Sequence, residues 1–121
     1  MRIQAIAGVL VAAAMLAGSA NAAQVRMVGT TTADARLSED VMRHVMLIAN
    51  GLLHCSTVTL IEPELLPPSF KPSGGPHAEC SAETTYERWN VTLCGKKVPF
   101  LVAFWSASVG GTMFRVGYPF Q

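Results

Sequence analysis

The stretch YERWNVTLCGKKVPFLVAF, residues 86–104, contains two runs of alternating character that meet at a tight Cys-Gly-Lys-Lys corner. Alternate residues of both runs are β-branched, aromatic or leucine, and we expect them to share one face: Trp89, Val91, Leu93, Val98, Phe100, Val102 and Phe104. Period-two alternation that is interrupted by a glycine-containing turn predicts an antiparallel hairpin. The stretch therefore places a pair of strands at the centre of the fold.

Upstream of this hairpin, residues 37–53 have the spacing of an amphipathic helix. Apolar side chains recur every three or four positions at Leu37, Val41, Val45, Ile48 and Leu52. Ser38 is the expected N-cap, because serine is a favoured capping residue and acidic side chains follow it. An apolar stripe of this width predicts a helix that lies on a sheet.

Further strands complete the expected fold. Residues 57–61 predict a strand that ends at Glu62-Pro63, and residues 112–116 predict a strand after a second turn. Residues 25–27 fit either a short edge strand or a flexible leader. The sequence thus predicts an α+β domain in which one main helix packs on a small antiparallel sheet of three to four strands.

Residues 1–22 have the three regions of a Sec-type signal peptide. Arg2 supplies a positive charge, an apolar run follows, and the small residues Ala20 and Ala22 precede the expected cleavage site. The apolar run is too short for a comfortable transmembrane span. We therefore expect a single periplasmic or secreted domain, residues 23–121, with no stable membrane insertion after cleavage.

The charge balance and the motifs argue against several classes of function. The chain has nine Lys and Arg against eight Asp and Glu, and removal of Arg2 makes the mature counts equal. A nucleic-acid-binding protein needs a basic face, so we expect no nucleic-acid partner. The sequence contains no G-x-S-x-G, Ser-x-x-Lys or H-E-x-x-H motif, so we expect neither catalysis nor a cofactor. Glu79, Glu83 and Glu87 are expected to face solvent.

The three cysteines are Cys55, Cys80 and Cys94. An exported domain meets an oxidising compartment, which predicts a disulfide, and the odd number leaves one thiol over. A Cys55–Cys94 bridge would join the helix end to the hairpin tip and is favoured, because regular elements hold a bridge better than a mobile loop. The pair Cys80–Cys94 remains the alternative.

The same residues suggest a competing hypothesis. His54-Cys55 and His77-x-x-Cys80 combine imidazole and thiol groups, which suit zinc or copper. A small metal- or thiol-dependent enzyme, or a metal-binding protein, that uses His54, His77 and Cys80 is therefore the alternative function. Against it, an oxidising compartment favours sulfur–sulfur over sulfur–metal bonds.

Two features suggest a binding surface. The outer side of the second hairpin strand is unusually apolar, and we expect Trp89, Leu101, Trp105 and Phe70 to contribute to an interaction surface, unless the long loop covers it. That loop, residues 63–82, contains five prolines and lacks a regular pattern, so it is either functional or disordered. The expected partner is an unknown protein of the cell envelope, with a homodimer as a further candidate. A loop beside a rigid hairpin suggests an inhibitor of an envelope enzyme.

Residues 87–95 (ERWNVTLCG), Val98-Pro99, Phe104 and residues 110–114 (GGTMF) resemble a pattern in small exported proteobacterial proteins of unknown function. The pattern is E-x-W-x-V-x-x-C-G, a Val-Pro strand, an aromatic residue and G-G-T-x-F, and it covers the C-terminal third of the chain. The resemblance implies a fold but no reaction. Cys80 is additional to the pattern, which gives further support to pairing of Cys55 with Cys94.

Overall fold

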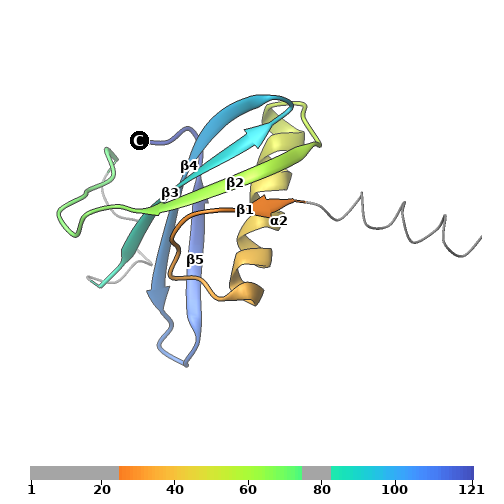
Figure 1. The fold of residues 1–121 in the computed structure, drawn as a ribbon. Coiled ribbons are helices and arrows are strands. Elements are labelled where there is room, and N and C mark those ends of the chain that lie inside the picture. The colour runs from red at the N-terminus through yellow and green to blue at the C-terminus, as the bar shows by residue number, and fades with distance from the viewer. Residues whose placement is uncertain (1–24, 75–82) are drawn as a thin grey trace, which may run out of the picture.

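One helix and a five-stranded sheet form the fold in the computed structural model, which describes residues 25–74 and 83–121 (Figure 1). The elements are, in chain order, β1 (Arg26–Met27), α2 (Ala35–Leu52), β2 (Val58–Leu65), β3 (Thr85–Leu93), β4 (Lys96–Ser106) and β5 (Thr112–Gly117). The strands lie in the sheet in the same order, and α2 covers one face. The predicted α+β class is confirmed. The predicted signal peptide, residues 1–22, lies outside the described residues.

The predicted sheet of three to four antiparallel strands is wrong in number and in direction. The structure has five strands, and β1 pairs parallel with β2, so that Arg26 lies opposite Leu60. The other strand pairs are antiparallel. The sequence did not decide between a strand and a leader at β1, because two strand residues give no periodic pattern. The strand is held by its pairing with β2.

Strand β2 also runs through the Glu62-Pro63 pair at which the sequence predicted its end. The carbonyl oxygen of Pro63 accepts a hydrogen bond of 3.1 Å from the Thr30 amide, so Pro63 directs its backbone toward the β1 side. Because the nitrogen of a strand residue points the same way as its carbonyl, the missing N–H of Pro63 removes no hydrogen bond to β3. A proline at this position therefore leaves the β2–β3 ladder intact.

A two-residue turn, Cys94–Gly95, joins β3 to β4, and Leu93 pairs with Lys96 on either side of it. Both turn residues have positive φ, 49° at Cys94 and 82° at Gly95. This combination is typical of a type I′ turn, whose twist matches that of a hairpin. The predicted hairpin is confirmed, and its register sets Trp89 opposite Phe100.

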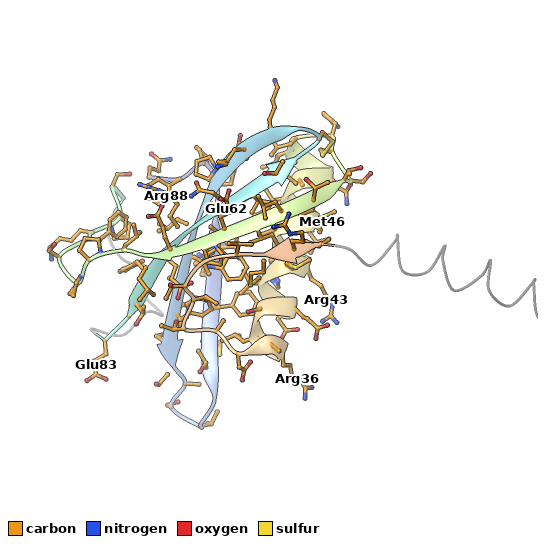
Figure 2. The ribbon with its side chains drawn as sticks, in the orientation of Figure 1. Arg36, Arg43, Met46, Glu62, Glu83 and Arg88 are labelled. Carbon is orange, nitrogen blue, oxygen red and sulfur yellow. A yellow bond between two sulfur atoms is a disulfide. The ribbon has the colours of Figure 1, made fainter. Side chains whose placement is uncertain are left out.

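Helix α2 begins at Ala35, two residues before the predicted start at residue 37, and its N-cap lies four residues before the predicted one. The N-cap is Asp34, whose carboxylate accepts a hydrogen bond of 2.8 Å from the Leu37 amide. Ser38, the predicted cap, instead lies on the buried side of the helix. The core between helix and sheet contains Val41, Val45, Ala49, Ile61, Val91 and Val102, together with aromatic residues of β3 and β4. Arg36 and Arg43 are exposed and point away from the sheet (Figure 2).

The predicted disulfide between Cys55 and Cys94 is present, with 6.1 Å between the two Cα atoms. Cys55 lies just beyond α2 and is buried, and Cys94 occupies the hairpin turn. The Cys94 amide also donates a hydrogen bond of 3.0 Å to the Thr57 carbonyl. The bridge therefore fixes the C-terminal end of the helix to the corner of the sheet. Within residues 25–74 and 83–121, no helix is long and apolar enough to cross a membrane.

We expect the double substitution Cys55→Ala and Cys94→Ala to lower the free energy of unfolding by about 2–4 kcal/mol, because the bridge closes a long loop in the unfolded chain. Chemical denaturation of the oxidised protein and of the variant measures the difference. A Cys80→Ala variant is the control and should unfold like the unaltered protein. Identical unfolding midpoints for the double variant and the unaltered protein would contradict a stabilising bridge.

Candidate functional site

Glu87 is a fully buried carboxylate on the side of β3 that faces the helix. It lies two residues before Trp89, so both side chains point to the same face, and it pairs with Val102 of β4. The prediction that this carboxylate faces solvent is wrong. The hairpin register places Glu87 in the same row as the apolar core residues, and its charge must therefore be balanced inside the protein.

Four donors converge on the Glu87 carboxylate. Oε1 accepts hydrogen bonds from the Thr31 hydroxyl at 2.7 Å and from the Trp89 indole Nε1 at 2.8 Å. Oε2 accepts from the backbone amide and the hydroxyl of Thr32, both at 2.8 Å. Each carboxylate oxygen thus receives two hydrogen bonds, which offset the large desolvation cost of a buried carboxylate. The Glu87 carboxylate therefore connects β3 to residues 31 and 32. All four of these hydrogen bonds are made within the protein.

The segment that supplies the threonines, residues 25–33, is called the strap here. It lies along β2, where the Val28 amide donates to the Ile61 carbonyl at 2.9 Å and the Thr30 amide donates to the Pro63 carbonyl at 3.1 Å. Between these bonds Gly29 has a φ of 136°, and a Cβ atom at this position would overlap the Pro63 carbonyl oxygen. The strap is therefore held by backbone bonds along β2 and by Glu87 at its end.

The sheet face opposite the helix has two different regions. At one end, the Phe70 ring packs 5.4 Å from the Tyr86 ring and 6.0 Å from the Phe120 ring. The Arg88 guanidinium lies 4.6 Å from the centre of the Phe120 ring, within the range of a cation–π contact. Part of the long loop and the C-terminal end thus pack against the outer face here.

The second region of the outer face carries paired charges, and it meets the first region at Arg88. Arg88 and Glu64 form an ion pair of 3.0 Å between β3 and β2, and Lys97 and Glu62 form one of 2.9 Å between β4 and β2. Figure 2 shows Glu62 and Arg88 on this side of the sheet. All four side chains are at least one third exposed, and ion pairs of this kind contribute little to stability.

The four residues predicted for an interaction surface differ in how exposed they are. Phe70 and Leu101 are half-buried, on or above the outer face. Trp105 is only 7% exposed. Trp89 is 0% exposed and belongs to the core, because its position in β3 places it on the helix side. The Trp89 side chain therefore has no exposed area, and its indole nitrogen donates a hydrogen bond to Glu87.

A pocket of about 190 Å³ opens where the strap and the start of α2 meet the ends of β3, β4 and β5. Its lining consists of Thr32, Leu37, Glu83, Thr85, Phe104, Trp105, Ser106 and Thr112. The walls thus combine hydroxyl groups and one carboxylate with parts of two aromatic rings. Thr32 also belongs to the Glu87 cluster, so any movement of the strap would change the shape of this pocket.

The residues of the metal hypothesis are only partly described. His54 is exposed and has a φ of 52° at the end of α2, where the Cys55 amide donates to the Ala49 carbonyl at 3.0 Å. A left-handed residue commonly ends a helix, which accounts for this backbone conformation. His77 and Cys80 lie outside the described residues. In the remainder of the chain that the structure describes, no group of three or more His, Cys, Asp or Glu could hold a metal ion.

Comparison with known proteins finds no match to this chain among protein-family profiles, curated proteins or solved structures.

We expect Glu87→Gln to lower the free energy of unfolding by about 2–4 kcal/mol. The new NH₂ group is itself a donor, so it would leave two of the buried donors without an acceptor. Urea denaturation measures the loss. Glu64→Gln is the matched control, since that carboxylate is exposed and pairs only at the surface, and it should cost less than about 1 kcal/mol. Equal losses of stability in the two variants would show that the buried cluster contributes no more than a surface ion pair.

We expect Gly29→Ala to detach the strap, because the added Cβ overlaps Pro63 and the left-handed backbone disfavours any side chain. The expected loss of stability is about 2 kcal/mol or more, with faster hydrogen exchange at the Val28 and Thr30 amides. In the control Gly51→Ala, the new methyl group in α2 meets nothing within 4 Å and should raise stability by up to about 1 kcal/mol. Slow exchange at Val28 in the Gly29 variant would contradict this account of the strap.

Proposed function

We propose that the chain is an exported, non-catalytic binding protein that presents part of its long loop to a protein partner in the cell envelope. The observation that carries the proposal is the packing of Phe70 on Tyr86 and Phe120, which fixes the described part of the loop to the sheet. An inhibitor of an envelope enzyme is the most concrete form of this function, because such a protein must hold an exposed segment in one shape.

The loop is held at several points. The Leu66 amide donates to the Tyr86 carbonyl at 2.9 Å, which continues the β2–β3 pairing beyond the end of β2. The Phe70 amide closes a turn onto the Pro67 carbonyl at 2.9 Å. Ser73 donates from its hydroxyl to the side chain of Gln121 at 3.3 Å. These contacts reduce the freedom that binding would otherwise remove, and reduced freedom favours affinity.

Exposed side chains of the same segment are available for recognition. Pro67, Pro68, Ser69 and Lys71 are exposed, whereas Phe70 between them is half-buried. Consecutive prolines stiffen the backbone, and the Lys71 ammonium supplies one positive charge. The segment therefore combines a rigid backbone with a charged group, which suits a partner cleft with acidic character.

Export is part of the proposal and has two supports. The Cys55–Cys94 disulfide suits an oxidising compartment, in which such bonds persist. The sequence of residues 1–22 has the regions of a signal peptide. Together they favour a periplasmic or secreted protein.

The test compares retention of envelope proteins on the immobilised exported chain and on variants. Lys71→Glu reverses the exposed charge, and Phe70→Ala releases the loop, so we expect each to weaken retention of the partner about tenfold or more. Lys96→Glu, the same charge reversal at the far corner of the hairpin, is the control and should bind like the unaltered chain. Equal retention by all four proteins would refute the proposal, as would no retention by the unaltered chain.

A further inference from the structure

Strand β5 leaves an open edge of the sheet, because it is the last strand in the part of the chain that the structure describes. The Ala107 amide bonds to the Gly111 carbonyl at 3.0 Å, which makes these two residues a hydrogen-bonded pair. Such pairs alternate along an antiparallel ladder, so Met113, Arg115 and Gly117 direct their backbone groups to β4. Thr112, Phe114 and Val116 consequently direct theirs to the open edge.

The two edges of the sheet differ in how they are protected. At the β1 edge the strand is only two residues long and is followed by Gly29 in a left-handed conformation. The β5 edge is six residues long, has no proline, lysine or bulge, and carries a single charged side chain, Arg115. An edge of this kind is a template for another strand.

Exposed apolar side chains border this edge on both faces of the sheet. Met113 is 48% exposed on the outer face. On the helix side, the His44 ring packs edge-on against Phe114 at 4.8 Å, which locates this flank of α2 beside β5. Leu47, 69% exposed, lies three residues further along and therefore shares that flank. The open backbone edge thus runs between two apolar side chains.

We propose that two copies of this chain form a symmetric dimer by antiparallel pairing of β5 with β5. The pairing that uses all three open residues of each copy is centred on Phe114, which faces its own counterpart across the two-fold axis. Thr112 then pairs with Val116 of the second copy. A two-fold interface of this kind is self-complementary and closes after two subunits. The proposal is independent of the function proposed above.

Charge supports this register over a shifted one. With Phe114 on the axis, Arg115 lies opposite Met113 of the second copy, so no two like charges face each other. A pairing centred on Arg115 would instead place two arginines directly opposite each other, and like charges in that position are destabilising. Because the two-fold axis is perpendicular to the joined sheet, the two Leu47 side chains lie on the same side of it.

The test uses opposite charges at one exposed site. Met113→Glu would place a carboxylate beside Arg115 of the second copy, whereas Met113→Arg would place two guanidinium groups together. Because the interface contains this contact twice, we expect Met113→Glu to lower the dimer dissociation constant about two- to thirtyfold and Met113→Arg to raise it by a similar factor. Sedimentation equilibrium measures both constants. Met27→Arg, the same change at the β1 edge, is the matched control and should leave the constant unchanged.

Residue-resolved hydrogen exchange gives a second measurement on the unaltered protein. With rising concentration, the Thr112, Phe114 and Val116 amides should become protected, while the Met113 and Arg115 amides, already bonded to β4, should not change. A chain that sediments as a monomer at every concentration would overturn the proposal. It would also be overturned if both Met113 variants shifted the constant in the same direction, or if Met27→Arg acted like Met113→Arg.

Discussion

The Cys94–Gly95 turn is the constraint on which the other features of the structure depend. Two residues with positive φ fix the register of β3 against β4, and a slip of one residue would exchange the two faces of the sheet. The disulfide at the same corner holds the end of α2. Register and helix position are thus set together, and both decide that Glu87 and Trp89 face inward while Arg88 faces outward.

The elements that follow from a local pattern could be predicted from the sequence, and those that depend on distant partners could not. Alternation in β3 and β4, the apolar stripe of α2 and the favoured disulfide all appear in the structure. The burial of Glu87 was missed because two of its donors lie more than fifty residues away, on Thr31 and Thr32. Asp34 and Ser38 are both good capping residues, and only the packing of Ser38 toward the sheet decides between them.

For the candidate site, the sequence indicated which residues to consider but not which of them are exposed. Alternation within β3 already grouped Trp89 with the core side chains, so its inclusion in an interaction surface conflicted with a pattern visible in the sequence itself. The anchoring of the loop by Phe70 requires Phe120, which lies fifty residues further along the chain. A dimer through β5 would contain two copies of the proposed binding segment, residues 67–71, so one assembly could hold two partner molecules and gain from their joint attachment.

The strap has a consequence for the order in which the protein assembles. Each strand from β2 to β5 pairs with the next one along the chain, so this part of the sheet grows by short-range steps. The strap precedes Ile61, Pro63 and Glu87 in the chain, and these three residues accept its hydrogen bonds. The strap can therefore complete its hydrogen bonds only after β2 and β3 have formed, and until then water must satisfy its donors.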